Sequence, residues 1–260
     1  MDSDTFLFDK IIFGPIKSRR LGLSLGVNLL PVDSKLCNFN CIYCECGWTG
    51  VKSNLGRTFN SRDDVKKSLE EKMIQLQSED ITPDAINFAG NGEPTMHPQF
   101  SEIINDTIEL KKSYFPDAKI AVLTNASMLN RKRVADALRK VDLRILKLDA
   151  GTEELFQQIN QPHSKISLNW VADHLQYFHG DLTVQSMFLK GTINGVSIDN
   201  TNEINVNGWL ELLKKINPKQ VMIYSINRAT AGEGLETIPH EKLKEIEMKV
   251  IELGINTMVS

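Results

Sequence analysis

The sequence predicts an α/β protein built on a mostly parallel β-sheet. Short apolar segments alternate along the chain with segments in which apolar residues recur every three or four positions. The first pattern is typical of buried strands and the second of covering helices, which right-handed connections join into a parallel sheet. A chain of 260 residues can bury one large core. We therefore predict a single domain over residues 1–260, with an N-terminal extension through residue 20.

The strands of this sheet are the short segments of mostly apolar residues, which are typical of strands buried on both faces. We predict strands at residues 23–30, 85–89, 119–124, 143–149, 182–190 and 220–226. With their helices they form six βα units before the C-terminal segment INTMVS. Periodicity alone does not distinguish an open sheet from a barrel.

The helices are predicted from apolar residues with a period near 3.6. Ser61 and Asp64 form a capping-box pattern before the first helix, and Gly254 ends the last one. The apolar positions that define the helices are Val65, Leu69 and Met73; Phe100, Ile103, Ile104 and Ile108; Val134 and Leu138; Ile166 to Phe178; Leu210, Leu213 and Ile216; and Leu243, Ile246, Val250 and Leu253.

The composition argues against several classes of protein. Lys and Arg total 30 against 33 Asp and Glu, a net charge of -3, so no global positive field exists to attract nucleic acid. No apolar segment approaches the roughly 20 residues that cross a bilayer. The first ten residues carry three acids and no basic n-region, unlike a secretory signal. We therefore expect a cytoplasmic protein with no membrane partner.

All four cysteines lie within residues 37–46, in the segment CNFNCIYCEC. Cytoplasmic proteins rarely contain disulfides, and cysteines used as small apolar residues would be scattered over the chain. Clustered thiols instead indicate a metal site or a redox pair. The spacing of Cys37, Cys41 and Cys44 suits three ligands of an iron–sulfur cubane, which leaves one iron open for chemistry.

Two alternatives to an iron–sulfur enzyme stay open at this point. A structural zinc site would need a fourth ligand such as His97, and Cys44 and Cys46 lie too close in sequence to chelate one tetrahedral ion well. A non-enzymatic electron-transfer protein would hold an iron–sulfur cluster without any further cofactor.

The spacing C-x3-C-x2-C, with Tyr43 before the last cysteine, resembles the cluster loop of radical S-adenosylmethionine (SAM) enzymes. The resemblance implies a partial (β/α)6 TIM-like barrel over nearly the whole chain, with a cluster-binding loop at residues 31–50. It also implies one 4Fe–4S cluster on the three cysteines of the pattern, with SAM chelating the open iron. In that superfamily an electron from the reduced cluster cleaves SAM to methionine and a 5′-deoxyadenosyl radical. Cys46 lies outside the pattern, and we interpret it as an incidental thiol near the cluster.

The segment GNGEPT directly follows a predicted strand, at the end where parallel α/β sheets bind their ligands. Its two glycines let the backbone approach a ligand closely, and its glutamate offers a carboxylate to a cation. A tight turn ended by the proline is the structural alternative. The segment is similar to the radical SAM motif GGEP, which binds the amino group of SAM, with asparagine replacing the middle glycine. The residues implied in SAM binding are Gly90, Asn91, Gly92 and Glu93.

Polar residues also follow later strands. Asn125 either contacts SAM or caps the turn into the next helix. Strand alternation puts Lys147 and Asp149 on one face, where a buried lysine and acid are costly unless they are paired or functional. We place Asp149, with Tyr43, in the SAM pocket or beside the substrate; a buried ion pair that only fixes the interior is the alternative. Weaker candidates for substrate contacts are Gln185, Ser186, Ser225, Asn227 and Arg228.

A basic segment, GPIKSRRLGLSLGV, precedes the cysteine loop. Together with CNFNCIYC and GNGEPT it resembles a radical SAM subgroup of single-cluster iron–sulfur oxidoreductases related to wybutosine-type tRNA-modifying enzymes. The resemblance implies that Arg19 and Arg20 face an anion, either the SAM carboxylate or a substrate phosphate, whereas a solvated surface is the alternative. The sequence contains no second cysteine cluster, which disfavours enzymes that carry auxiliary clusters.

These observations predict a radical SAM enzyme that abstracts hydrogen from an unidentified substrate and receives electrons from a donor such as flavodoxin or ferredoxin. RNA is one candidate substrate. Lys17, Arg19, Arg20 and the basic run at 131–144 favour it, whereas the net charge and the lack of a recognisable RNA-binding appendage oppose it. A nucleotide-like molecule, a small metabolite and a protein glycyl site are the other candidates.

Overall fold

The computed structural model describes residues 5–18, 20–50, 58–163 and 165–260. Its strands are β1 (Ile12–Ser18), β2 (Gly22–Val27), β3 (Ala85–Phe88), β4 (Lys119–Thr124), β5 (Leu143–Lys147), β6 (Thr183–Ile193), β7 (Val196–Asp199), β8 (Gln220–Ser225), β9 (Leu235–Thr237) and β10 (Asn256–Val259). The main sheet has the order β1-β2-β3-β4-β5-β6-β8-β10. Neighbours from β2 to β10 are parallel, which confirms the predicted α/β class. Among the described residues β1 and β10 do not pair with each other, so the sheet is open.

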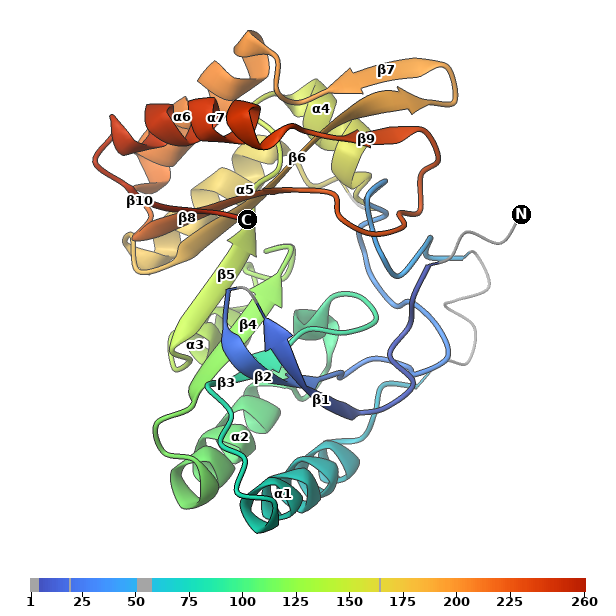
Figure 1. Cartoon of the computed structure of the whole chain (residues 1–260), viewed down its shortest axis with the longest axis vertical. Coiled ribbons are helices and arrows are strands. Elements are labelled where there is room, and N and C mark those ends of the chain that lie inside the picture. The colour runs from blue at the N-terminus through green and yellow to red at the C-terminus, as the bar shows by residue number, and fades with distance from the viewer. Residues whose placement is uncertain (1–4, 19, 51–57, 164) are drawn as a thin grey trace.

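Helices follow most of the parallel strands and cover the outer face of the sheet. They are α1 (Arg62–Ser78), α2 (Phe100–Tyr114), α3 (Lys132–Leu138), α4 (Glu153–Asn160), α5 (Leu168–Leu175), α6 (Glu203–Ile216) and α7 (His240–Ile251), with short 3-10 turns η2 (Pro94–Met96) and η3 (Gln176–Phe178). Figure 1 shows α1, α2 and α3 along the lower half of the molecule and α5, α6 and α7 along the upper half. The central strands bury Leu25, Ile86, Val122, Leu146 and Val184 in one continuous core.

The start of the first helix confirms the predicted cap. The Ser61 side chain accepts a hydrogen bond from the backbone N–H of Asp64 at 3.1 Å, which satisfies one of the free donors at the helix terminus. Val65, Leu69 and Met73 then face the core, as their spacing predicts. Gly254 lies three residues beyond α7 with a φ of +77°, a conformation that glycine adopts without steric cost.

The N-terminal region contributes to the sheet. Within the predicted extension through residue 20, Ile12 to Ser18 form β1, which pairs antiparallel with β2 in a register that joins Ile12 to Val27. Part of this extension is therefore an edge strand of the main sheet.

Several elements differ from the sequence prediction. Helix α4 was not predicted, because only Leu155, Phe156 and Ile159 are apolar in its eight residues. The C-terminal segment forms β10, a further parallel strand beside β8. Strand β6 continues beyond residue 190 to Ile193, where β7 and β9 pair with it antiparallel.

Among the described residues, no helix combines the length and the apolar character that crossing a bilayer requires.

Candidate cofactor site

The cysteine loop extends across the segments that follow several parallel strands. The Leu36 N–H donates to Asn91 O at 2.8 Å beyond β3, and the Ile42 N–H donates to Ile159 O at 2.9 Å in α4. On the other side, the Gly232 N–H donates to Ile42 O at 2.7 Å, from the loop between β8 and β9. Backbone hydrogen bonds therefore fix the loop at both of its flanks.

A buried cation lies among the thiols. Lys35 is 4% exposed and its Nζ donates to Gly47 O at 2.8 Å. Burial opposes its charge, but the neighbouring Cys44, Cys37 and Cys41 thiolates raise the pKa of Lys35 overall. A positive charge in this position stabilises thiolates, the form in which cysteine binds metal.

The four thiols are free and differ in their surroundings. Burial raises the pKa of Cys37 and of Cys41. The hydrogen bond from Cys46 is the main cause that lowers the pKa of Cys44, to about 6, and Lys35 adds to this effect. Cys46 therefore contacts a predicted ligand directly, and its Sγ also lies 3.6 Å from Gly90 O.

The zinc alternative required His97 as a ligand, and both ring nitrogens of His97 are already used. Its Nε2 lies 2.8 Å from Asn60 O, and its Nδ1 accepts from the Gln99 N–H at 3.0 Å. In the part of the chain that the structure describes, no three Cys, His, Asp or Glu side chains converge on a single metal ion, as a zinc site requires; the thiolates of a cubane each bind a different iron and need not converge in this way.

Glu93 joins the ends of β3 and β4 through its carboxylate. Oε1 accepts from the Thr95 N–H at 3.0 Å, from the Thr95 hydroxyl and from the Thr124 hydroxyl at 2.6 Å. Oε2 accepts from the Asn125 N–H at 2.7 Å. Burial raises the pKa of Glu93, although these hydrogen bonds oppose the shift. Oε2 carries one of the four hydrogen bonds and keeps a lone pair for a cationic ligand.

Asn91, which replaces the middle glycine of the motif, is fully buried. Its Nδ2 donates to Pro31 O at 2.8 Å and to Phe8 O at 2.9 Å, and its Oδ1 accepts from the Phe8 N–H at 2.9 Å. The side chain thus connects the N-terminal segment to the start of the cysteine loop, a role that glycine could not fill.

Gly92 is required by the path of the backbone. Its φ is +136°, and a Cβ would lie 2.0 Å from the backbone oxygen of Leu36. We expect Gly92→Ala to lower the free energy of unfolding by about 2–4 kcal/mol, since backbone strain adds to a clash that no side-chain rotation relieves. Urea unfolding measures this effect. Gly195→Ala is the matched control, because its φ of +79° is also positive but its Cβ would meet open space. Equal losses in the two variants would contradict the clash.

Asn125 stabilises the turn after β4 and lies beside the cysteine loop. Its Oδ1 accepts from the Ser127 N–H at 3.0 Å, which stabilises the turn after β4. Its Nδ2 lies 3.0 Å from Asn38 Oδ1 and 3.7 Å from Cys37 Sγ. Asn125 and Glu93 therefore lie beside the first cysteine of the pattern.

A buried network surrounds Tyr43 on the other side of the loop. The Tyr43 hydroxyl donates to Asp149 Oδ2, which also accepts from Asn160 Nδ2 at 2.8 Å. Asp149 Oδ1 accepts from the Met187 N–H at 2.8 Å, so the carboxylate is held by protein groups. Asn160 Nδ2 also lies 3.5 Å from Cys41 Sγ. Asn160 was not predicted, because it ends a helix that the sequence analysis missed.

Lys147 and Asp149 form a buried ion pair, the arrangement that the sequence analysis gave as the alternative to a SAM or substrate contact. Lys147 Nζ lies 3.4 Å from Asp149 Oδ1 and donates to the hydroxyl of Tyr224 on β8. Burial opposes the charge on Lys147, but Asp149 raises the lysine pKa above its usual value. The guanidinium of Arg20 lies 4.8 Å from the centre of the Tyr224 ring. Arg19 lies outside the described residues.

A comparison with protein families decides the identity of the chain. Residues 32–189 match the Radical SAM superfamily, a range that includes the three cysteines, Glu93, Asn125 and Asp149. The chain belongs to the radical SAM superfamily. It is therefore an enzyme, and the alternative of a non-enzymatic metal protein is wrong. Membership implies an iron–sulfur cluster and SAM.

Curated relatives match most of the chain. The chain is 34% identical to UPF0026 protein MJ1312 of Methanocaldococcus jannaschii, covering 81% of this chain and 61% of that protein. It is 30% identical to a UPF0026 protein of Helicobacter pylori strain J99, covering 90% and 72% of the two chains. It spans less than two thirds of the length of the first relative.

Three solved structures share the fold at low identity. A radical SAM methyltransferase from Sphaerobacter thermophilus has a TM-score of 0.67 at 15% identity, covering 91% of this chain and 65% of that one. Streptococcus suis SuiB bound to S-adenosylmethionine has a TM-score of 0.62 at 14% identity, with coverage of 90% and 50%. Archaeal TYW1 has a TM-score of 0.54 at 12% identity, with coverage of 88% and 71%. These likenesses confirm the TIM-like α/β fold of this radical SAM enzyme.

The remaining predicted contact residues lie in different places. Gln185 is buried on β6 beside Lys147. The Ser225 hydroxyl is used within the fold, because it donates to Phe188 O and accepts from the Ile238 N–H, both at 2.8 Å. Arg228 is exposed and pairs with Glu45 at 2.9 Å. Substrate contacts by these residues stay predictions.

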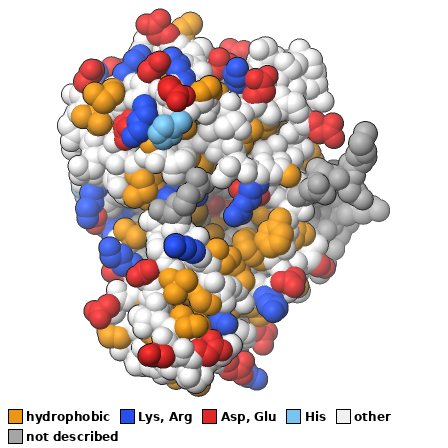
Figure 2. All heavy atoms as spheres, viewed as in Figure 1, with side chains coloured by type: hydrophobic (Ala, Val, Ile, Leu, Met, Phe, Trp, Pro, Cys, Tyr) orange, Lys and Arg blue, Asp and Glu red, His pale blue; other side chains and the backbone are white. Residues whose placement is uncertain are grey.

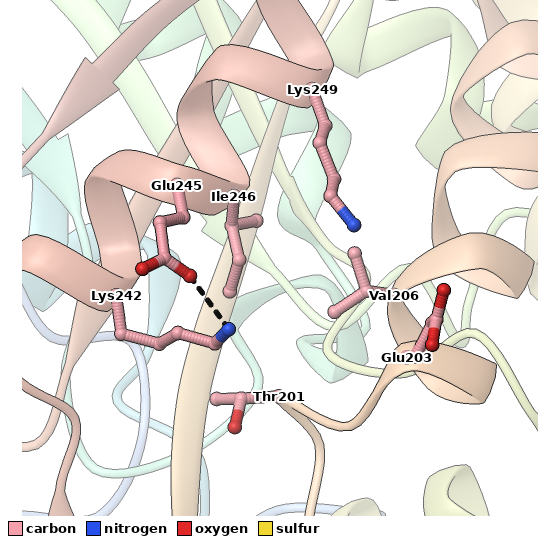
Figure 3. Close-up of a pocket in the computed structure, with 7 residues that line it drawn as sticks. All are labelled: Thr201, Glu203, Val206, Lys242, Glu245, Ile246 and Lys249. Carbon is pink, nitrogen blue, oxygen red and sulfur yellow. Dashed lines mark hydrogen bonds and ion pairs between the residues drawn. The ribbon is translucent and has the colours of Figure 1, made fainter.

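A separate surface pocket of about 190 Å³ lies between α6 and α7. Figure 3 shows that charged side chains line it, among them the ion pair of Lys242 and Glu245 at 2.7 Å. Its lining contains none of the predicted site residues of this radical SAM enzyme.

Proposed function

We propose that Cys37, Cys41 and Cys44 hold one 4Fe–4S cluster and that SAM binds beside it, against Glu93 and Asn125. One-electron reduction of SAM at such a cluster supplies methionine and a 5′-deoxyadenosyl radical, which takes a hydrogen atom from the substrate. The observation that carries the proposal is the position of Asn125 Nδ2, 3.7 Å from Cys37 Sγ, while its backbone N–H is bound to Glu93. The predicted ligand and the predicted SAM contacts thus share one site.

Each residue then has a defined task. Lys35 offsets the negative charge of the thiolates in a buried environment. The Glu93 carboxylate accepts from the SAM amino group, and its four existing hydrogen bonds fix its orientation before SAM arrives. Asp149 and Asn160 hold the Tyr43 hydroxyl, so the ring keeps one position against the SAM pocket. The half-buried cysteine loop limits the access of water to the reacting atoms.

The basic run at 131–144 gives little support to RNA as the substrate. Lys132 pairs with Asp136 at 2.5 Å, and Arg144 pairs with Asp181 at 2.7 Å. On the face in Figure 2, basic and acidic side chains are intermixed. The positive charge is therefore offset at two of the six basic positions of this run, whereas an RNA backbone would need a continuous positive surface. We therefore propose a substrate other than RNA.

We also propose that a flavodoxin or ferredoxin donates the electron. Residues 1–260 act as one domain in this proposal.

The test is SAM cleavage by anaerobically reconstituted enzyme with a chemical reductant. We expect 5′-deoxyadenosine and methionine to form in equal amounts, measured by chromatography. Cys41→Ala is expected to form neither product. Cluster-loaded wild-type enzyme that binds SAM but never cleaves it under reduction would contradict the proposal.

A further inference from the structure

Two cations flank one tyrosine ring. The Arg20 guanidinium, from the turn between β1 and β2, lies 4.8 Å from the centre of the Tyr224 ring. Lys147 Nζ, at the end of β5, lies 4.9 Å from the same centre. Such contacts stabilise each cation, but they leave its N–H groups available for hydrogen bonds.

The charges of the group formed by Arg20, Lys147 and Tyr224 do not cancel. Lys147 is offset by Asp149 at 3.4 Å, and Asp149 already binds Tyr43, Asn160 and the Met187 N–H. Within the described part of the chain, no acidic side chain lies at ion-pair distance from Arg20. One unit of positive charge therefore stays uncompensated.

Arg20 also has an unsatisfied donor. Its Nη1 is buried and has no hydrogen-bond partner among the described residues. A buried donor without an acceptor costs about 1–3 kcal/mol, and more when it is charged. An acceptor supplied by a ligand removes this cost. The Lys147 side chain is 17% exposed, so the group can be reached.

The group lies apart from the predicted amino-binding end of SAM. Glu93 and Asn125 follow β3 and β4, whereas Tyr224 lies on β8, three strands beyond β4 in the sheet order. Lys147 Nζ nevertheless lies 4.8 Å from the centre of the Tyr43 ring, and Tyr43 precedes a cysteine of the loop. Lys147 thus lies beside the cysteine loop, on β5 between β4 and the strand of Tyr224 in the sheet order.

We propose that Arg20, Lys147 and Tyr224 bind an anionic group of the substrate, a carboxylate or a phosphate. Arg20 donates through Nη1, and the Lys147 ammonium and the Tyr224 hydroxyl provide further donors. This inference rests on the proposed function, since it assigns the chemical class of the substrate. Neutral analogues would leave the buried donors unpaired, so the enzyme discriminates against them. The carboxylate of SAM is the other source of the same chemistry.

The test uses reconstituted, cluster-loaded enzyme with inorganic phosphate and succinate as probes, at constant ionic strength, with and without SAM. We expect a saturable rise in melting temperature with at least one probe. Arg20→Gln should weaken the binding of that probe about tenfold or more. The affinity for SAM, measured by calorimetry, should stay unchanged. Arg20→Lys keeps the positive charge and should retain much of the probe binding. This result would show that the loss in Arg20→Gln comes from the missing charge and not from a folding defect.

Arg139→Gln is the matched control, because the Arg139 guanidinium also stacks on a tyrosine, 3.8 Å from the Tyr177 ring centre, on the exposed side of the molecule. It should leave probe binding unchanged. Two results would overturn the inference: no saturable binding of either probe to wild-type enzyme, or a loss of SAM affinity in Arg20→Gln, which would assign these cations to the SAM carboxylate. Iron content and wild-type SAM binding, measured separately, report on the proposed function itself.

Discussion

Alanine in place of Cys37, Cys41 or Cys44 is expected to abolish iron binding. Wild-type enzyme reconstituted without oxygen should hold about four iron atoms per chain, the content of one cubane. Each of these thiols would be the protein ligand of a different iron, so the loss of one leaves two irons without protein ligands. The half-buried loop around them offers no spare thiolate except Cys46. Iron and sulfide analysis, with the visible absorbance of the cluster, measures the effect.

Cys46→Ala is the control for this experiment. The Cys46 thiol hydrogen-bonds to Cys44 and lies 3.6 Å from Gly90 O, so it shares the surroundings of the three predicted ligands. The variant should keep about four irons, because its sulfur is outside the three-cysteine pattern. One zinc atom per chain in protein purified without oxygen, with no uptake of iron, would contradict the cluster assignment.

Glu93→Gln is expected to weaken SAM binding by about 1.5–3 kcal/mol, or roughly 10- to 100-fold, while iron content stays at the wild-type level. The substitution removes the negative charge that faces the SAM amino group and keeps the volume of the side chain. It is preferable to Glu93→Ala, because glutamine keeps one oxygen for the Thr95 and Thr124 donors and loses the acceptor of the Asn125 N–H alone, whereas alanine would leave all of these donors without an acceptor. Calorimetry with cluster-loaded enzyme measures the affinity.

Glu247→Gln controls for the general cost of neutralising a buried carboxylate. Glu247 is 9% exposed on α7 and accepts from Lys244 and Thr257, at 2.7 and 2.8 Å. It should bind SAM as the wild type does. Unchanged SAM affinity in Glu93→Gln would remove Glu93 from the site.

The strands were predictable because each is a short segment that the core buries on both faces, and burial selects apolar residues at successive positions. Helix α4 was not predictable, because its apolar residues extend only from Leu155 to Ile159. These are too few positions to establish a helical period. The antiparallel strands β7 and β9 are short and partly exposed, so their sequences resemble loops.

At the candidate site, Glu93 and Asp149 could be predicted because each is a polar residue close to the end of a predicted strand. Residues whose role depends on distant partners were missed. Lys35 resembles an ordinary loop lysine, and its proximity to three thiols appears only in three dimensions. Tyr224 resembles a core residue of β8, and only the positions of Lys147 and Arg20 make it part of the proposed anion site. Alternation along β8, which puts Tyr224 on the face of Met222, was the available signal.

The backbone contact between the cysteine loop and the loop after β8 restricts how the chain can change in length. Ala231 and Gly232 donate their N–H groups to Cys44 O and Ile42 O, although nearly 190 positions separate these segments in sequence. An insertion between β8 and Gly232 would move these donors and, with them, the spacing of the thiols. The turn between β6 and β7 is different, because a Cβ at Gly195 meets open space. Insertions and deletions should therefore be tolerated at this turn and excluded from the other loop, even though both connections contain exposed residues.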